Sequence, residues 1–282
     1  MANPQKRSCR HLLQEAAAQI QAAGRTLLAE RATAQAFGLA LPTAPTPREV
    51  SQAVDLLAVF GGDGTMLRVA REVAGSPTPM MGINLGGLGF LTGVQSQQLP
   101  AALEQIWAGR FTLESRSLIE ASGSASGRLI HELALNDFVV GRGAAPRLID
   151  LEVSVDDQVL TRYRCDGLIV CTPTGSTAYS LAAGGAVVSP SAEVLTLTPI
   201  CPHTLSNRSV IVGLDSIIRV RTLSSRTETI LTADGQISHP LAQEEVITIR
   251  RSSHSVRLLQ LAGSSFFETL RIKLNWRGSS VL

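Results

Sequence analysis

An apolar run that leads directly into a glycine-rich turn is the feature that most constrains the fold of this chain. Residues 54–60 read VDLLAVF, residues 61–65 read GGDGT, and residues 66–74 resume helical spacing. A continuous apolar strand is typical of a parallel sheet covered on both faces. A glycine-rich turn between such a strand and a helix N-terminus places backbone N–H groups where they bind phosphate. The stretch therefore predicts an α/β domain with an anion-binding turn.

A carboxylate, Asp63, lies at the centre of this turn. The glycines beside it would permit positive φ and the close approach of a polyphosphate, and Thr65 would cap the following helix. Asp63 opposes anion binding by like-charge repulsion. It would therefore organise a magnesium ion, accept a proton from an attacking hydroxyl, or act only as an Asx-type turn residue, and the turn alone leaves these alternatives open. The predicted phosphate loop consists of Gly61, Gly62, Gly64 and Thr65.

The sequence pattern that indicates secondary structure changes near residue 111. Before it, helical patterns such as residues 8–37 alternate with short apolar strands such as residues 80–84. After it, short alternating runs separated by turn residues indicate antiparallel β structure. The expected strands are residues 128–132, 138–140, 149–155, 168–171, 217–220, 246–249 and 256–261, with hairpin turns at residues 122–127 and 156–157. We expect an N-terminal Rossmann-like α/β domain (residues 1–112, rejoined by a helix in residues 264–282) and a C-terminal antiparallel, β-sandwich-like domain (residues 113–263).

Composition narrows the class of protein. The 282 residues are 44% hydrophobic and 17% charged, as in ordinary globular chains, and a net charge of +2 does not favour a nucleic-acid partner. The start lacks the apolar stretch of a signal peptide, and the apolar runs are shorter than a membrane span. We therefore expect a cytoplasmic protein with no membrane partner. Neither the histidines nor the cysteines have metal-ligand spacing, and we expect free thiols at Cys9, Cys165, Cys171 and Cys201.

Further polar segments are candidates for ligand binding. Residues 166–181 read DGLIVCTPTGSTAYSL, whose hydroxyls suit a ribose, an amide or a phosphate, or else a capped helix start. Residues 136–137, Asn-Asp, offer donors and acceptors for a base edge or a ribose diol, or form an ordinary turn. Residues 233–236, ADGQ, are turn-like in isolation. Arg147 and Arg164 are either solvated strand residues or partners for a pyrophosphate.

Taken together, these segments resemble the NAD kinase family in its bacterial, ATP-dependent form. The matching stretches are GGDGTML at 61–67, GINLGGLGFLT at 82–92, ALNDFVVGRG at 134–143, DGLIVCTPTGSTAYSLAAGG at 166–185 and ADGQ at 233–236. The fourth stretch is highly specific, whereas GGDGT alone also occurs in diacylglycerol-type lipid kinases. The resemblance implies phosphoryl transfer from ATP to the 2′-hydroxyl of the adenosine ribose of NAD, which gives NADP. It also implies NAD held between the two domains and between subunits.

The resemblance also implies roles for individual residues. Asp63 corresponds to the proton acceptor for the 2′-hydroxyl, with Gly64 beside it. Arg68 would lie near phosphate, and Phe90 would form a wall of the adenine pocket. The positions that match dinucleotide-binding residues are the pair Asn136 and Asp137, then Arg147 and Arg164, then Asp166 for the nicotinamide half, then Thr177, Ala178, Tyr179, Ser180, Leu181 and Ala182 along the adenosine, and finally Gln236.

The implied partners are NAD and ATP, with polyphosphate as an alternative donor, and the implied cofactor is Mg²⁺ bound mainly through ATP. A homodimer or homotetramer is typical of the family. This chain has Asn-Asp at 136–137 where Asn-Glu is common, and Ala182 replaces a frequent hydroxyl residue. The family's first strand ends near an Asn-Pro, and here Asn3-Pro4 follows almost nothing. We therefore expect either that the sheet lacks this strand or that the start lies upstream.

Two other functions compete with this interpretation. A lipid kinase shares GGDGT, but such kinases usually continue with Asn-Glu after the turn, whereas this chain continues Met66-Leu67-Arg68. Their β domain also lacks the hydroxyl-rich TPTGSTAY segment. A non-catalytic dinucleotide-binding protein is the second rival, and Asp63 argues against it because a pure binder would gain from neutralising that charge.

Overall fold

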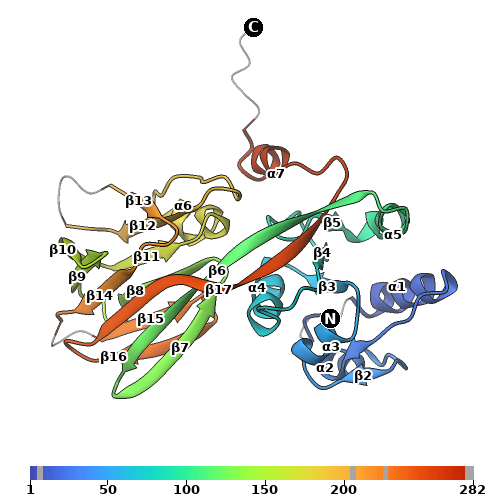
Figure 1. The fold of residues 1–282 in the computed structure, drawn as a ribbon, viewed down its shortest axis with the longest axis horizontal. Coiled ribbons are helices and arrows are strands. Elements are labelled where there is room, and N and C mark those ends of the chain that lie inside the picture. Colours follow the sequence, from blue (N-terminus) through green and yellow to red (C-terminus); the bar gives the residue numbers. More distant parts are fainter. Residues whose placement is uncertain (5–8, 204–207, 225–227, 277–282) are drawn as a thin grey trace, which may run out of the picture. The chain divides into compact units, whose positions relative to one another are not determined.

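The computed structural model describes residues 1–4, 9–203, 208–224 and 228–276, and it divides into two units (Figure 1). The N-terminal unit contains Met1–Ser115 together with Val256–Leu282, and the β unit contains Arg116–Ser255. Within the described residues, no helix combines the length and apolar character that a membrane span needs.

The N-terminal unit is built around short parallel strands. β3 (Leu57–Gly61) pairs in parallel with β4 (Met80–Asn84), and β4 pairs in parallel with β5 (Val94–Gln95). The last part of β17 (Val246–Leu261) adds a parallel partner to β4, with Leu258 opposite Met80. All five residues of β4 are buried, as are four of the five in β3. The parallel, two-sided strand predicted from residues 54–60 is confirmed.

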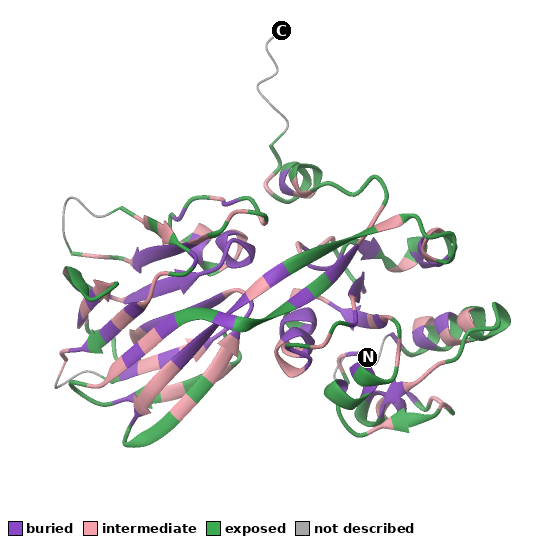
Figure 2. Ribbon diagram, viewed as in Figure 1, coloured by how far each residue is buried: buried purple, intermediate pink, exposed green. Residues whose placement is uncertain are grey.

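Helices cover these strands because the apolar face of each helix is buried only when it packs against another element. The N-terminal unit has α1 (Arg10–Ala22), α2 (Arg31–Phe37), α3 (Pro47–Gln52), α4 (Asp63–Glu72), α5 (Leu99–Trp107) and α7 (Phe266–Lys273), with the 3₁₀ turn η2 (Ser96–Gln98) before α5. One core cluster joins Leu13 of α1, Phe60 of β3, Ile83 of β4 and Leu103 of α5. Burying such side chains supplies the main driving force for packing the helices on the sheet. Figure 2 shows the buried residues of these elements in purple.

The single helix expected over residues 8–37 is wrong. Residue 8 lies outside the described residues, and the remainder forms α1 and α2 separated by β1 (Ala29–Glu30). Gly24 adopts φ +72° directly after α1, a left-handed conformation that ends a helix. β1 then pairs in parallel with β2 (Thr43–Ala44). Ala-rich composition favours helix on both sides of this break, so composition alone concealed it.

The first residues of the chain lie at the edge of the sheet beside β3. Ala2 forms a parallel bridge with Phe60 and is fully buried. The N–H of Phe60 donates to the carbonyl of Met1 at 2.8 Å, and the N–H of Asn3 donates to the carbonyl of Phe60 at 3.3 Å. The first residues therefore form a one-residue bridge beside β3, at the position where the first strand is expected, and among the described residues no strand begins there.

The β unit consists of two antiparallel sheets. The first has the order β13 (Val210–Gly213), β12 (Val194–Ile200), β11 (Gly167–Cys171), β8 (Asp137–Arg142), β15 (Thr229–Ala233), β16 (Ile237–Leu241). The second joins β10 (Gln158–Cys165), β9 (Ile149–Val155), β14 (Ile218–Thr222) and β17, and it also contains the hairpin of β6 (Phe111–Ala125) and β7 (Arg128–Ala134). A 3₁₀ turn, η3 (Thr174–Thr177), and a single helical turn, α6 (Tyr179–Ala182), follow β11.

Alternation along the strands places one apolar core between these two sheets. Phe138 and Val140 of β8 belong to a cluster that also contains Leu151 of β9 and Val220 of β14. Successive side chains of a strand point to opposite faces. Val139 accordingly falls in a separate cluster on the outer face of the first sheet. The sandwich-like fold predicted for the C-terminal part is confirmed, and its outer face is left available for a ligand.

Two details of the β prediction are corrected. The strands expected at residues 246–249 and 256–261 are one continuous strand, β17, because the polar residues between them continue the ladder. The turn expected at residues 122–127 is shorter: residues 122–125 belong to β6, and the chain reverses at Ser126 and Gly127, which have φ +48° and +77°. The turn at residues 156–157 is confirmed by positive φ at both aspartates.

Candidate functional site

The glycine-rich turn connects β3 to α4 within the N-terminal unit. Gly62 is the N-cap of α4, and Asp63 is its first helical residue. The prediction that Thr65 caps the helix is wrong, because Thr65 lies inside the first turn and is only 7% exposed. The helix N-terminus still presents backbone N–H groups, so the turn retains the physical basis for anion binding.

Gly61 and Gly89 are required for space and not for positive φ. Gly62 has φ −106°, and no glycine of the two turns is among the described residues with positive φ. A Cβ on Gly61 would overlap the hydroxyl of Thr65 and lie 2.6 Å from its Cβ. A Cβ on Gly89 would overlap Asp63 Oδ1 and lie 2.9 Å from its Cγ. The absent side chains therefore allow the turn, the helix and the second glycine-rich loop to approach closely.

Asp63 joins the two glycine-rich segments. The backbone N–H of Phe90 donates to Asp63 Oδ2 at 2.9 Å, and that of Leu91 donates to Asp63 Oδ1 at 3.0 Å. The hydroxyl of Thr92 donates to Asp63 Oδ1 at 3.3 Å. These donors, together with the position of Asp63 in the first turn of α4, offset a negative charge in an anion-binding turn. The like-charge conflict raised by the sequence is resolved by local hydrogen bonding.

Two further predicted residues of this unit have protein partners. Arg68 lies on α4, and its Nη1 is 3.4 Å from Glu30 Oε1 and 3.1 Å from Glu72 Oε1. The ring of Phe90 lies 5.9 Å from the Nζ of Lys273 on α7. Among the described residues, no three His, Cys, Asp or Glu side chains are grouped as metal ligands would be.

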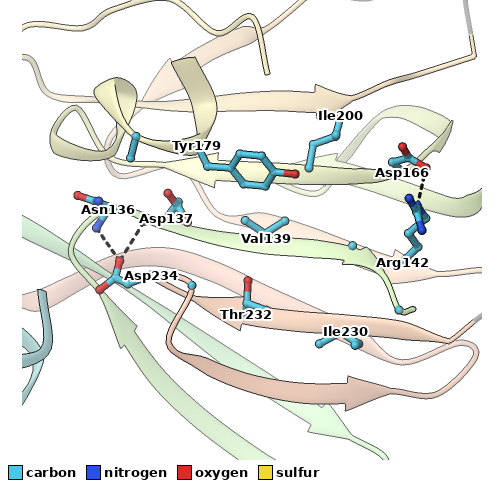
Figure 3. A pocket seen from close by; sticks show the side chains of 14 residues that line it. Asn136, Asp137, Val139, Arg142, Asp166, Tyr179, Ile200, Ile230, Thr232 and Asp234 are labelled. Atoms are coloured by element: carbon cyan, nitrogen blue, oxygen red, sulfur yellow. Dashed lines mark hydrogen bonds and ion pairs between the residues drawn. The ribbon is translucent and has the colours of Figure 1, made fainter. Parts of the chain in front are cut away.

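A pocket of about 620 Å³ lies on the outer face of the first sheet of the β unit (Figure 3). Five predicted site residues line it: Asn136, Asp137, Asp166, Ala178 and Tyr179. The other lining residues are Val139, Gly141, Arg142, Gly143, Ile200, Ile230, Thr232, Asp234 and Gly235. The alternation of β8 explains the apolar floor, because Val139 faces outward while its neighbours enter the core.

At one end of the pocket, Asp234 holds the backbone of the Asn-Asp pair. Asp234 Oδ1 accepts from the N–H of Asn136 at 2.8 Å and from that of Asp137 at 3.2 Å, while Oδ2 accepts from the N–H of Leu135 at 3.2 Å. The N–H of Asp234 donates back to the carbonyl of Asp137 at 2.9 Å. The side-chain Oδ1 of Asn136 is buried and has no hydrogen-bond partner among the described residues. Such an orphaned acceptor costs about 1–3 kcal/mol, which a donor that reached it would relieve.

Burial changes the acidity of Asp137. Its side chain is 4% exposed, and desolvation, followed by the nearby carboxylate of Asp234, raises the pKa of Asp137 from 3.8 to about 7. Burial and a like charge both disfavour the ionised form. The ligand-free protein therefore holds a carboxyl group that titrates near neutral pH at the wall of this pocket.

We expect the stability of the ligand-free protein to fall as pH rises from 5 to 8. Because the folded-state pKa of Asp137 is raised above the unfolded value, the folded state binds more protons in this window and loses stability as they dissociate. An Asp137→Asn variant should lose less stability over the same range, with a difference of at most about 3 kcal/mol. Urea unfolding at pH 5 and at pH 8 measures the free energy of unfolding of each protein. Asp55→Asn, the same change at an exposed aspartate, should behave like the unaltered protein. Equal pH dependence in all three proteins would contradict the raised pKa.

At the other end of the pocket, Arg142 forms an ion pair with Asp166. Arg142 Nε donates to Asp166 Oδ1 at 2.8 Å, and Arg142 Nη1 donates to the carbonyl of Ala145 at 3.0 Å. Figure 3 shows this pair and the Asn136–Asp137 end on either side of Val139 and Ile200. Sequence reasoning missed Arg142. The matching stretch ALNDFVVGRG contains it, and extending the strand predicted from Phe138 by two residues would have placed it at the end of that strand.

The hydroxyls of the TPTGSTAY segment mostly bind the protein itself. The Thr172 hydroxyl donates to the carbonyl of Leu135 at 2.6 Å, and the Ser176 hydroxyl donates to that of Pro173 at 2.7 Å. Directly after the segment, the hydroxyl of Ser180 shares a hydrogen bond at 2.9 Å with that of Thr198 on β12. All four of these hydroxyl-bearing side chains are buried. The excess of hydroxyls in this segment therefore serves in large part to anchor the loop beside Asn136.

The remaining predicted residues lie outside the pocket lining. Arg147 and Arg164 are exposed, and Arg164 lies on β10 opposite Asp150. Gln236 is exposed next to Gly235, which does line the pocket. The other members of this group come from η3 and α6: Thr177 and Leu181 are partly exposed, Ser180 is buried, and Ala182 is exposed.

Comparison with known proteins agrees with both halves of this arrangement. The family model of the ATP-NAD kinase N-terminal domain matches residues 1–111, and that of the C-terminal domain matches residues 135–261. The chain is 44% identical over 260 residues to the NAD kinase of Symbiobacterium thermophilum, covering 91% of this chain and 90% of that protein. It is 45% identical over 227 residues to the NAD kinase of Syntrophotalea carbinolica, covering 79% of each.

Solved structures agree with the sequence relatives. Yeast NADH kinase complexed with NADH superposes with a TM-score of 0.88 and 26% identity, over 99% of this chain and 87% of that one. An NAD kinase from Archaeoglobus fulgidus in complex with ATP gives a TM-score of 0.71 and 28% identity, over 87% of this chain and 92% of that one. With two family models that together match most of its length and relatives above 40% identity, the chain belongs to the NAD kinase family.

Proposed function

We propose that the protein transfers a phosphoryl group from ATP to the 2′-hydroxyl of the adenosine ribose of NAD and so produces NADP. The observation that carries this proposal is the match of both domains to the ATP-NAD kinase family, together with an aspartate in the glycine-rich turn at a helix N-terminus. Phosphoryl transfer needs mainly positioning and charge neutralisation. The N-terminal unit supplies groups for the donor, and the β unit supplies a pocket for the acceptor.

Asp63 is the residue to which we assign the proton transfer. Among the described residues, its Oδ1 accepts two hydrogen bonds and its Oδ2 accepts one. A carboxylate oxygen can accept two, so Oδ2 has room for the hydroxyl of a substrate. The reaction requires the 2′-hydroxyl to reach this oxygen. The N-terminus of α4, where Gly64 lies beside Asp63, would face the phosphates of the donor, and Gly61 and Gly62 would allow these to approach.

The β-unit pocket is the proposed site for the dinucleotide. Its volume of about 620 Å³ falls within the range of ligand pockets, and its floor is apolar between two polar ends. Asn136 and Asp137 would accept ribose hydroxyls at one end, and the ion pair of Asp166 would meet the other half of the ligand. Ala178 and Tyr179 would line the adenosine, as the predicted assignments require.

Several predicted contacts belong to this proposal without lying in the pocket lining. They are Arg68 and Phe90 near the donor and the adenine, and Arg147, Arg164, Thr177, Ser180, Leu181, Ala182 and Gln236 around the dinucleotide. An assembly of two or four copies, in which subunits share the NAD, would bring exposed residues such as Arg147 to a ligand. The four cysteines, all of them among the described residues, form no disulfide, which suits the reducing cytoplasm that we propose as its compartment.

Mg²⁺ is the divalent cation that we propose for the reaction. This ion keeps several waters and is usually bound through substrate phosphates with one or two carboxylates, so ATP would carry most of its ligands. The donor set of the glycine-rich turn, backbone N–H groups and a single carboxylate, fits a metal that arrives with the nucleotide. When bound, the ion would neutralise charge on the transferred phosphoryl group.

The test is a phosphorylation assay with ATP and magnesium in which NAD, NADH and diacylglycerol are compared as acceptors. We expect a product with the pyridine dinucleotides and none with the lipid. A parallel series with polyphosphate as donor decides between the two donors. Phosphorylation of diacylglycerol alone would favour a lipid kinase, and binding of NAD without turnover would favour a non-catalytic dinucleotide-binding protein.

A further inference from the structure

A chain of side-chain hydrogen bonds leads from the end of β4 to Asp63. The N–H of Gly86 donates to Asn84 Oδ1 at 2.7 Å. Because a backbone N–H can only donate, this contact fixes which end of the Asn84 amide is the oxygen. Asn84 Nδ2 then donates to the hydroxyl oxygen of Thr92 at 2.7 Å. The Thr92 hydroxyl hydrogen is left for Asp63 Oδ1, its only acceptor among the described residues.

The topology explains why these residues meet. In the parallel pair of β3 and β4, Gly61 lies opposite Asn84, so the carboxyl ends of both strands share one edge. Asp63 follows the first strand by two residues, and Asn84 ends the second. Ligands of α/β proteins bind at this edge of the sheet. A Cβ at Gly89 would overlap both Asp63 Oδ1 and the Thr92 hydroxyl, so the glycine permits this approach.

The side chains that link Asn84 to Asp63 through hydrogen bonds are buried, and their polar groups bind one another. Thr92 is 0% exposed and Asn84 is 5% exposed. Polar groups at such depth are nearly always hydrogen-bonded, and removal of one partner leaves the other unsatisfied. At 3.3 Å the contact between Thr92 and Asp63 is the longest of the three that Asp63 receives from the described residues. Of these three it is also the only one made by a side chain, so it can be removed without changing the backbone.

We propose that Thr92, oriented by Asn84, is a positioning residue for Asp63. With the N–H of Leu91, the Thr92 hydroxyl fills the acceptor capacity of Oδ1 and fixes the carboxylate plane. Oδ2 is then the oxygen that accepts the proton of the substrate hydroxyl. This inference rests on the proposed function, because it assumes that Asp63 is the proton acceptor. Thr92 itself is fully buried and would touch neither substrate.

The test compares Thr92→Val, which removes the hydroxyl at constant shape, with Thr92→Ser, which keeps it. We expect Thr92→Val to lower kcat about 10- to 100-fold, the range for a hydrogen bond to a charged group, with the KM values for ATP and NAD unchanged within about twofold. Thr92→Ser should restore kcat to within about threefold of the unaltered enzyme. Thr78→Val is the matched control: among the described residues its buried hydroxyl binds only the carbonyls of Ser51 and Val54, so it should lower thermal stability and leave kcat unchanged.

Asn84→Asp provides an independent test that keeps side-chain volume. The new carboxylate would still accept from Gly86, but it could no longer donate to Thr92 and would draw the hydroxyl hydrogen away from Asp63. The same loss of kcat is expected, and adding Thr92→Val should lower kcat little further because both changes break one chain. If Thr92→Val does not fold, this variant decides the question.

Three results would overturn the inference: normal kcat in Thr92→Val or in Asn84→Asp, a loss that appears in KM instead of kcat, or failure of Thr92→Ser to restore turnover. The activity of the unaltered protein distinguishes these results from a failure of the proposed function. If the unaltered protein does not phosphorylate NAD, the proposed function itself is wrong. If it does and the Thr92 and Asn84 variants are normal, only the positioning role is wrong.

Discussion

Asp63→Asn should lower kcat about 10²- to 10⁴-fold, the range for loss of a positioned general base. The amide cannot accept the ribose proton, and its NH₂ group would face one of the backbone donors, Phe90 or Leu91. The dissociation constant for NAD should change by no more than about twofold, because the pocket residues lie in the β unit. Steady-state kinetics and calorimetric titration with NAD measure the two effects separately.

The control for Asp63→Asn has to separate chemistry from folding. Glu104→Gln makes the same carboxylate-to-amide change at an exposed position of α5 and should leave kcat unchanged. Thermal unfolding of Asp63→Asn reports how far the second glycine-rich loop has lost its anchor. An Asp63→Asn enzyme with near-normal turnover would contradict the assignment of Asp63 as the general base, whatever the stability of the variant.

Gly175→Ala should disrupt both the stability of the β unit and NAD binding. A Cβ on Gly175 would overlap the carbonyl oxygen of Asn136 and lie 2.6 Å from its C and 2.8 Å from its Cα. These are backbone atoms, so no side-chain rotation relieves the overlap. Overpacking of this kind costs about 1–3 kcal/mol or more, and relief requires displacement of the Asn136–Asp137 segment. The affinity for NAD should therefore fall about tenfold or more.

Gly213→Ala is the matched control for this change. Gly213 ends β13 in the same unit, and an added Cβ there would meet, among the described residues, only Ser216 Oγ at 3.9 Å. Its melting temperature and NAD affinity should stay near those of the unaltered protein. If Gly175→Ala melted like Gly213→Ala and bound NAD normally, the close contact with Asn136 would not matter to the site.

The local pattern of the sequence predicted the strand, turn and helix around Asp63 because each rests on neighbouring residues. The apolar run of β3 needs cover on both faces, and the resumed helical spacing defines α4. The short run at residues 138–140 likewise predicted a strand, and these residues lie within β8. The motifs then located five residues of the pocket lining.

The contacts that shape the candidate site join residues too far apart for any local pattern. Asp63 is bound by the N–H of Phe90, 27 residues away, and Asp234 binds that of Asn136, 98 residues away. No periodic pattern in the sequence indicates such pairs. ADGQ was therefore interpreted only as a turn, and the anchoring role of Asp234 was missed. Glycine is ambiguous for a related reason. It serves either positive φ or close approach, and only the structure separates the two at Gly61 and Gly89.

The position of the new phosphate tests the central claim most directly. We predict that ³¹P NMR of a reaction with ATP, magnesium and NAD will show one new phosphomonoester and an equal amount of ADP, and that a dehydrogenase specific for NADP will accept the product. An NAD analogue with 2′-deoxyadenosine should give no new ester. Release of inorganic phosphate without an ester, or phosphorylation of the deoxy analogue, would contradict transfer to the 2′-hydroxyl.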